Sequence, residues 1–186
     1  MLLDEKLVAI ERALLGTDIP HAFGGANALA YYGTPRATAD IDVNVFVPVS
    51  RAREVLRVLA AIGVSADDSE LVDRISRDGQ VRLFWERTPI DVFFSYDALH
   101  ESSMARRRIV DFGADRIHVL SAEDLVVYKA IFNREKDWRD IAEIIYAAES
   151  GLDFDYVCSW VERICDRKDP QPARLRRLID SDGRDL

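Results

Sequence analysis

The sequence predicts an α/β fold, in which short strands alternate with helices over the first two thirds and helices alone follow. Three observations support this class. The alternation of apolar and polar residues over 41–47 has the period of a strand, and the apolar spacing over 4–15 is that of a helix. From Ser121 onward the periodicity is helical throughout. Because the chain has 186 residues and no low-complexity linker, we expect one compact unit whose architecture changes near residue 120.

Composition restricts the environment and the partners of the protein. The longest apolar runs are shorter than the roughly 20 residues that cross a bilayer, and the N-terminus lacks the basic start of a signal peptide. We therefore expect a cytoplasmic protein without membrane contact. The formal net charge of −8 argues against a general attraction to nucleic acid. Cys158 and Cys165 share an expected helix, and reduced thiols are the better interpretation.

Helices and strands alternate in the first part of the chain. The expected elements are a helix over 4–15, an extended run over 21–23, a helix over 26–32 and a strand over 41–47. Ser50 is a candidate N-cap for a further helix that runs to Ile62, because a serine oxygen can accept hydrogen bonds from the free amides of a first turn. The charged stretch 66–78 fits another short helix.

The middle of the chain is expected to form two pairs of strands, 80–86 with 90–94 and 107–112 with 116–120. Ser121 then offers a cap for the first of several helices, which we expect to be interrupted near Asn133. These patterns divide the chain into a core, residues 1–120, and a C-terminal helical region, residues 121–186, packed on that core.

Three aspartates are the strongest candidates for chemistry. Asp40 and Asp42 are two positions apart at the start of a strand, so their side chains point to the same face. Asp91 lies on another expected strand and completes the cluster if the two strands are neighbours; otherwise it is a solvated strand residue. Carboxylate oxygens are the ligands that Mg²⁺ or Mn²⁺ prefers, and such a cluster can hold two ions for in-line phosphoryl chemistry.

The glycine pair before this strand supplies a second element. Gly24 and Gly25 allow a phosphate to approach the backbone at the start of a helix. Arg36 and Thr38 precede the carboxylates, where a guanidinium can neutralise phosphate and a hydroxyl can add a hydrogen bond. The simpler interpretations are that Arg36 pairs with a nearby acid and that Thr38 shapes a turn.

In their order and spacing, Gly24-Gly25-Ala26, Tyr32-Gly33, Arg36, Thr38 and Asp40-Ile41-Asp42 resemble the signature of the polymerase-β-like nucleotidyltransferase superfamily. The most similar branch is that of the AbiEii-type abortive-infection toxins and their relatives. A second stretch, from Asp124 through Lys129 to Asp137 and Asp140, resembles the helical motif that follows the catalytic sheet in that branch. The resemblance extends over roughly residues 20 to 145.

This resemblance implies a small mixed β-sheet flanked by helices and a transfer of nucleoside monophosphate from NTP to an acceptor. Asp40 and Asp42 would bind both metal ions, and Asp91 would help to bind the catalytic one and accept the hydroxyl proton. Gly24, Gly25 and Ala26 would hold the triphosphate. Many active members have Ser or Thr where this chain has Ala26, which is the one departure from the pattern.

Other charged residues have two interpretations each. Lys129 can reach a phosphate, with Asp137 and Asp140 beside it in a nucleotide site, or it can form an ordinary salt bridge between helices. Arg106-Arg107-Arg108 is a candidate nucleic-acid contact or a solvated cluster. His21, His100 and His118 have no spacing typical of a metal-ligand set or a catalytic triad, so no role is assigned to them.

The leading hypothesis is therefore a metal-dependent nucleotidyltransferase that modifies a hydroxyl of an RNA, a protein or a small molecule. Its most specific form is a toxin with a cognate antitoxin as partner. The alternatives are a catalytically inactive nucleotide-binding or protein-interaction module of the same fold, and an antitoxin-like regulatory partner.

Overall fold

The computed structural model describes residues 1–66, 69–148, 151–166 and 168–184, and the chain divides into two compact units. One unit comprises Met1–Asn27 and Ala37–Leu120, and the other comprises Ala28–Arg36 and Ser121–Leu186. A boundary thus follows Leu120, while the short segment Ala28–Arg36 groups with the helical unit. The expectation that the helices pack on the core as a single compact unit stays a prediction.

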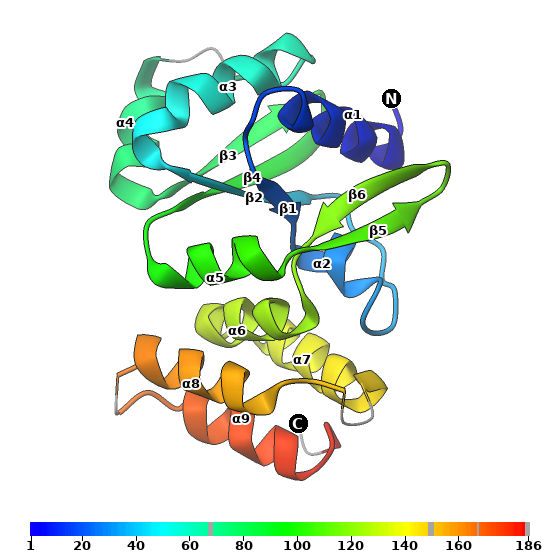
Figure 1. The fold of residues 1–186 in the computed structure, drawn as a ribbon, viewed down its shortest axis with the longest axis vertical. Helices are drawn as coiled ribbons and strands as arrows, with labels where there is room; N and C mark the ends of the chain where they lie inside the picture. Colours follow the sequence, from blue (N-terminus) through cyan, green and yellow to red (C-terminus); the bar gives the residue numbers. More distant parts are fainter. Residues whose placement is uncertain (67–68, 149–150, 167, 185–186) are drawn as a thin grey trace. The chain divides into compact units, whose positions relative to one another are not determined.

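A mixed sheet forms the centre of the first unit (Figure 1). Its six strands within the described residues are β1 His21–Phe23, β2 Ile41–Pro48, β3 Gln80–Trp85, β4 Thr88–Ser95, β5 Arg108–Phe112 and β6 Asp115–Val119. Their order is β3-β4-β2-β1-β6-β5. Strand β2 pairs in parallel with β4 and antiparallel with β1, whereas β1 and β6 are parallel. The hairpins β3–β4 and β5–β6 form the two ends of the sheet.

Helices lie on both sides of this sheet (Figure 1). On one side are α1 Leu3–Leu15, α3 Ala52–Ala61, which continues the 3₁₀ turn η1 Val49–Arg51, and α4 Ser69–Asp78. On the other side is α5 Ala98–Arg106, while the short α2 Gly25–Leu29 follows β1 and crosses the boundary of the units. Along β3 every second side chain is buried, and alternate residues of β4 are fully buried. One face of the hairpin therefore packs into the core, and the other is less buried.

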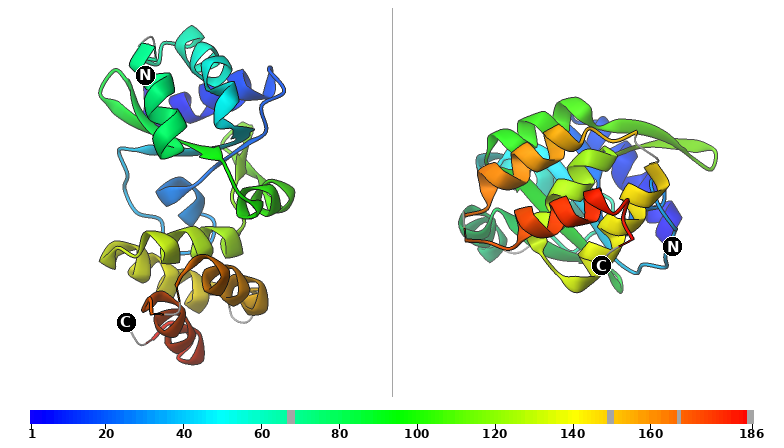
Figure 2. Two further views of the ribbon diagram at one scale, coloured as in Figure 1. Left: turned by 90° about the vertical axis from the view of Figure 1, so that its left-hand side faces the viewer. Right: turned by 90° about the horizontal axis from the view of Figure 1, so that it is seen from below.

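The second unit is helical in its described part. Its main elements are α6 Ala122–Phe132, α7 Glu135–Ala148, α8 Phe154–Ile164 and α9 Gln171–Asp180, and α6 packs against the other three (Figure 2). Ser121 caps α6, because its hydroxyl accepts a hydrogen bond from the amide of Asp124. Asn133 ends α6 in the left-handed conformation with φ of 55°, which turns the chain into α7.

The predicted fold class is confirmed: the protein has a small mixed sheet flanked by helices, followed by a helical region. The expected strands and both strand pairs are present within a residue or two of their predicted ends. The helix predicted over 66–78 is α4, which begins at Ser69; Asp67 and Asp68 lie outside the described residues. In the described part of the chain no helix has the length and apolar character that crossing a membrane requires.

Two expectations need correction, and one helix was not expected. Ser50 is not an N-cap: it lies inside the turn η1, and no side chain caps α3. The helix expected over 26–32 is shorter, because α2 ends at Leu29 and the chain turns before Gly33. Helix α5 was not predicted, because its few buried residues, Leu99, His100 and Ser103, do not form a clear apolar stripe.

Candidate functional site

Two of the three predicted aspartates lie side by side in the sheet. Asp42 of β2 and Asp91 of β4 are direct partners in the parallel pairing of these strands. On the next strand, Arg82 of β3 is the antiparallel partner of Asp91. The three side chains therefore form one row across neighbouring strands, which we call the carboxylate row: Asp42, Asp91 and Arg82. The condition that the sequence left open, adjacency of the two aspartate strands, is met.

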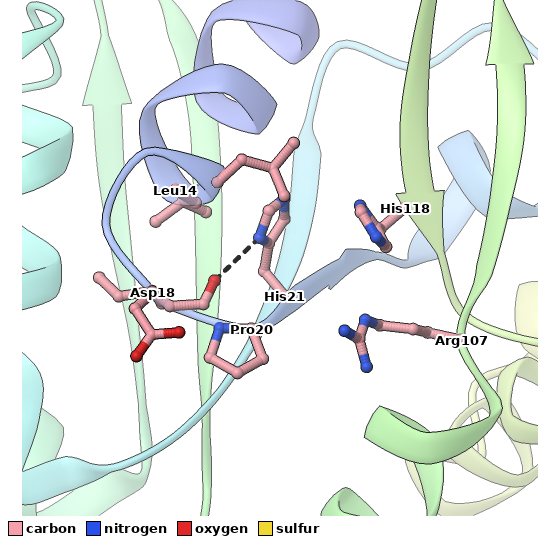
Figure 3. Close-up of a pocket in the computed structure, with 8 residues that line it drawn as sticks. Leu14, Asp18, Pro20, His21, Arg107 and His118 are labelled. Carbon is pink, nitrogen blue, oxygen red and sulfur yellow. Dashed lines mark hydrogen bonds between the residues drawn. The ribbon is translucent and has the colours of Figure 1, made fainter.

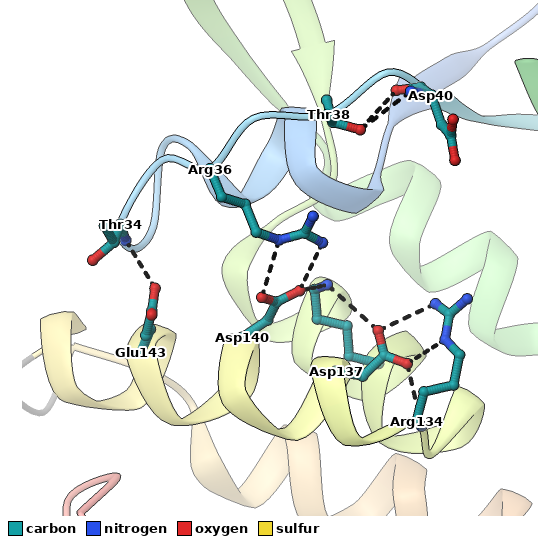
Figure 4. A network of polar contacts seen from close by, with 9 residues as sticks. Thr34, Arg36, Thr38, Asp40, Arg134, Asp137, Asp140 and Glu143 are labelled. Carbon is teal, nitrogen blue, oxygen red and sulfur yellow. Dashed lines mark hydrogen bonds and ion pairs between the residues drawn. The ribbon is translucent and has the colours of Figure 1, made fainter. Parts of the chain in front are cut away.

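Asp40 precedes β2, and the loop around it has a defined conformation. The Thr38 hydroxyl accepts a hydrogen bond from the Asp40 amide at 3.2 Å and donates one to the Asp40 carbonyl at 3.3 Å (Figure 4). The side-chain amide of Asn27 also donates to the Asp40 carbonyl, at 3.3 Å. Thr38 thus shapes the turn that leads into the strand, in agreement with the simpler of its two interpretations.

The glycine pair contacts the strand of the carboxylates directly. The Gly24 amide donates to the Asp42 carbonyl at 2.9 Å, which joins the end of β1 to β2. Gly25 has φ of 54°, in the left-handed region that favours glycine, and a β-carbon built on it would lie 1.8 Å from Oδ2 of Asp42. The backbone at Gly25 therefore packs against the Asp42 carboxylate, a closeness that no side chain at this position permits. Ala26, the next residue, is buried in α2.

Arg82 provides the positive charge of the carboxylate row. Its guanidinium donates two hydrogen bonds to Asp91, from Nε at 2.8 Å and from Nη2 at 2.7 Å. These bonds and the charge of Asp91, with smaller contributions from Asp40 and Asp42, raise the pKa of Arg82 above its ordinary value. All three carboxylates therefore act electrostatically on one guanidinium, as expected if they converge.

Sequence reasoning assigned no role to Arg82. The register of the hairpin identifies it. Trp85 pairs with Thr88, so the residue three positions before Trp85, Arg82, pairs with the residue three positions after Thr88, Asp91. The row is then read directly from the pairing of three strands.

The remaining predicted residues form a charged cluster inside the helical unit (Figure 4). Lys129 of α6 donates to Asp140 of α7 at 2.5 Å and lies 3.8 Å from the Asp137 carboxylate. Arg36 pairs with Asp140 through Nε and Nη2 at 3.3 and 3.2 Å, and Arg134 pairs with Asp137 at 2.6 Å. This network joins α6 to α7, because the lysine is on α6 and the two aspartates are on α7. All three residues are buried.

The electrostatics of this cluster favour the ionised carboxylate of Asp140. Burial alone would raise its pKa, but hydrogen bonds and charge from Lys129 and Arg36 outweigh that effect and hold the pKa below its ordinary value. The salt-bridge interpretation of Lys129 and Arg36 is thus observed. Their assignment, with Asp137 and Asp140, to nucleotide binding stays a prediction.

The basic stretch 106–108 does not form one exposed patch. Arg108 is exposed, whereas Arg106 and Arg107 are half-buried, and the Arg107 guanidinium donates to the carbonyl of Met104. The histidines also differ from expectation. His21 and His118 meet at Glu11, although their positions in the sequence gave no metal-ligand pattern.

The protein is similar to known proteins in its structure. No protein-family model matches this sequence, and no curated protein is significantly similar to it. Among solved structures, ANT(2'')-Ia in complex with adenylyl-2''-tobramycin is similar with a TM-score of 0.61 and 14% identity, covering 87% of this chain and 98% of that one.

Two further structures have the same arrangement. The lincomycin-bound lincosamide antibiotic adenylyltransferase LnuA has a TM-score of 0.54 at 14% identity, over 77% of this chain and 96% of that one. An antigenic nucleotidyltransferase-like protein from Paracoccidioides brasiliensis has a TM-score of 0.52 at 14% identity, over 94% and 92% of the two chains. The chain therefore has the fold of nucleotidyltransferases, while the AbiEii branch stays a prediction from its motifs.

Proposed function

We propose that the protein is a metal-dependent nucleotidyltransferase that transfers a nucleoside monophosphate from NTP to a hydroxyl group. The observation that carries this proposal is the carboxylate row, in which Asp42 and Asp91 are register partners on parallel strands and Gly25 packs against Asp42. Two adjacent carboxylates repel each other, so a divalent cation between them relieves an unfavourable arrangement.

The donor set fits Mg²⁺ or Mn²⁺. Asp40, Asp42 and Asp91 offer only hard carboxylate oxygens, which these ions prefer, and all three are accessible in part. We assign Asp40 and Asp42 to both ions and Asp91 to the catalytic one. The bound cation supplies positive charge that polarises the phosphate and stabilises the leaving pyrophosphate.

The reaction is a substitution at the α-phosphorus. A bond forms between the acceptor oxygen and this phosphorus, the bond from phosphorus to the bridging oxygen breaks, and pyrophosphate leaves with that electron pair. The hydroxyl proton passes to the Asp91 carboxylate, both oxygens of which accept hydrogen bonds from Arg82 in this structure, so this pair has to open first. Gly24, Gly25 and Ala26 would present the backbone to the triphosphate. Ala26 adds no hydroxyl, so this contact relies on backbone amides.

The acceptor hydroxyl is expected on an RNA, a protein or a small molecule. Small hydroxylated molecules are the first to test, because two of the similar structures belong to enzymes that act on antibiotics. The resemblance to AbiEii-type toxins supports the more specific proposal of a toxin restrained by a cognate antitoxin. Expression that leaves cell growth unchanged would argue against toxicity without affecting the proposed chemistry.

The deciding experiment is calorimetric titration of each NTP with Mg²⁺ into the wild type and into Asp42→Asn and Asp91→Asn. We expect metal-dependent binding in the wild type and its loss in both variants, because each change removes one anionic ligand at constant shape. The matched control is Glu54→Gln, which removes a partly exposed carboxylate of α3 that pairs with Arg51 outside the carboxylate row. It should bind NTP like the wild type.

Transfer itself is measured with α-labelled NTP and a panel of acceptors, by following incorporation of the label into the acceptor together with release of unlabelled pyrophosphate. NTP binding without pyrophosphate release on any acceptor class would favour the inactive module of the same fold. Absence of metal-dependent NTP binding in the wild type would overturn the proposal.

A further inference from the structure

A second cluster of ligand-type side chains lies in the sheet unit, on three elements that are distant in sequence. Glu11 comes from α1, His21 from β1 and His118 from β6. The Glu11 carboxylate lies between the rings, with Oε2 at 2.9 Å from Nε2 of His21 and Oε1 at 2.6 Å from Nδ1 of His118. One ligand atom from each residue lies within 4.8 Å of the others. The three side chains are 3%, 1% and 13% exposed.

The hydrogen bonds of His21 determine what its second nitrogen can do. Nδ1 lies 3.1 Å from the carbonyl oxygen of Ile19, so it carries the proton and donates it (Figure 3). In a neutral ring Nε2 is then a bare lone pair, and it faces an oxygen of Glu11. Two lone pairs at this distance require a positive charge between them, which is either a second proton or a metal ion.

The surroundings of the cluster favour the metal ion. A ring nitrogen that donates to a backbone carbonyl is the usual arrangement behind a metal-bound histidine, because it fixes the tautomer and orients the ligand nitrogen. Glu11 is likewise held in place by the backbone amide of His118, which donates to Oε2 at 3.0 Å. Both the carboxylate and the ring are therefore oriented by backbone groups before any ion binds.

The cluster also opens on a pocket of about 160 Å³, which His21 and His118 line together with Asp18 and Arg107 (Figure 3). An ion at the cluster would keep one position free toward this space. The charges of Asp18 and Arg107 offset each other at the pocket, so they do not oppose a cation. The buried Nε of Arg107 has no hydrogen-bond partner among the described residues.

From this geometry we propose that Glu11, His21 and His118 bind one divalent transition-metal ion of the zinc class, with its fourth position open to the pocket. The donor set of two imidazoles and one carboxylate is typical of open zinc sites. It is softer than the carboxylate row, which suits Mg²⁺. The sheet unit thus holds two chemically distinct cation sites, and the zinc-class site does not depend on the proposed transferase function.

The test uses the whole chain, stripped of metal by a chelator, and Zn²⁺ alone as probe in competition with a chromogenic chelator. We expect one equivalent of Zn²⁺ to bind. His118→Ala should weaken binding at least about tenfold, since loss of a ligand costs no less than loss of its supporting partner. Substitution with Co²⁺ should give the intense visible absorption of a four-coordinate site, and this spectrum should disappear in the same variant.

His100→Ala is the matched control. His100 also places Nδ1 2.6 Å from a carboxylate, that of Asp97, but it lies outside the cluster of Glu11, His21 and His118. It should retain Zn²⁺ affinity and the Co²⁺ spectrum, and so should Asp91→Asn. Because His118 is the most exposed of the three ligands, its removal should leave the fold intact by circular dichroism; Glu11→Gln, which keeps the shape, provides a second variant.

Two results would overturn the site. The first is a wild type that binds no Zn²⁺, which would show that His21 instead carries a second proton and pairs with Glu11. The second is Zn²⁺ binding that persists in both His118→Ala and Glu11→Gln but is lost in Asp91→Asn, which would assign the ion to the carboxylate row.

Discussion

The backbone of Gly25 lies against the Asp42 side chain, so that a β-carbon on Gly25 would be 1.8 Å from Oδ2 and 2.6 Å from Cγ of Asp42. The two residues are on different elements, at the start of α2 and on β2. The position of the carboxylate therefore depends on the lack of a side chain at the glycine, and the glycine pair and the aspartate motif are parts of one structure.

Gly25→Ala should displace the Asp42 carboxylate and abolish metal-dependent NTP binding. The change adds the steric conflict to the cost of placing alanine in the left-handed region, about 1 to 2 kcal/mol. Calorimetry measures the binding, and urea unfolding measures the stability. Gly113→Ala is the matched control, because Gly113 has φ of 63° but a β-carbon added there would meet no atom within 4 Å. That variant should lose stability alone, and equal NTP affinity in both variants would contradict the argument.

Arg82→Gln should raise the affinity for Mg²⁺ or Mn²⁺ in the absence of nucleotide. The guanidinium competes with a metal ion for Asp91, and its removal frees both carboxylate oxygens. An exposed ion pair is worth at most about 1 kcal/mol, so the gain should reach about fivefold. Titration of Mn²⁺ followed by electron paramagnetic resonance measures this affinity.

The control for this prediction is Arg51→Gln, which breaks an equally bidentate pair, with Glu54, outside the carboxylate row. Metal affinity should not change there. A lower affinity in Arg82→Gln than in the wild type would mean that the arginine orients Asp91 for the metal and does not compete with it.

Lys129→Met should destabilise the helical unit. The lysine is buried between Asp140 and Asp137, and its loss leaves buried carboxylates with less compensation. We expect the free energy of unfolding in urea to fall by about 2 to 3 kcal/mol, less than for a fully orphaned charge because Arg36 still pairs with Asp140. Arg176→Gln, which breaks the exposed pair with Glu162 in the same unit, should have a much smaller effect. Equal losses in the two variants would refute the structural role.

Because of Asp140, the free energy of unfolding should depend on pH in the acidic range. Its pKa in the folded protein is below the ordinary 3.8, so the folded state binds a proton less readily than the unfolded state. The stabilisation is fully present above the ordinary value and is lost as the pH falls toward the lowered pKa. Unfolding free energies measured from about pH 5 down to about pH 2 should therefore fall less steeply in Asp140→Asn than in the wild type. Parallel curves for the two proteins would exclude this contribution.

Local periodicity was sufficient to predict most of the fold. Strand β2 was predicted from alternation, α1 from apolar spacing and the hairpin β3–β4 from its β-branched and aromatic residues. One face of α1 and one face of the hairpin are buried, whereas β2 is buried on both faces from Val43 to Val47. Helix α5 was missed because it buries too little for a periodic signal. Ser50 was misassigned because a favourable capping residue describes a local preference, which the 3₁₀ turn at this point overrides.

Residues of the candidate site could be predicted where they belong to one sequence motif. They could not be predicted where residues from different elements come together only in the folded chain. Asp40 and Asp42 share one motif, whereas Asp91 required the parallel pairing of β2 with β4, and Arg82 required the register of the hairpin. Glu11 and His118 are 107 positions apart and meet only through the packing of α1 beside β6. No spacing rule applies to such a set, so its residues were assigned no role.

The grouping of Ala28–Arg36 with Ser121–Leu186 has a consequence for synthesis on the ribosome. Arg36 leaves the ribosome early, but its partner Asp140 follows 104 residues later. At about 5 to 20 residues per second, this segment waits roughly 5 to 20 s for the helices to which it belongs. The sheet unit can pair all its described strands during this interval, since they precede Ser121. The helical unit is therefore the last to complete its ion pairs, and the early segment is the part of the nascent chain that a chaperone would meet exposed.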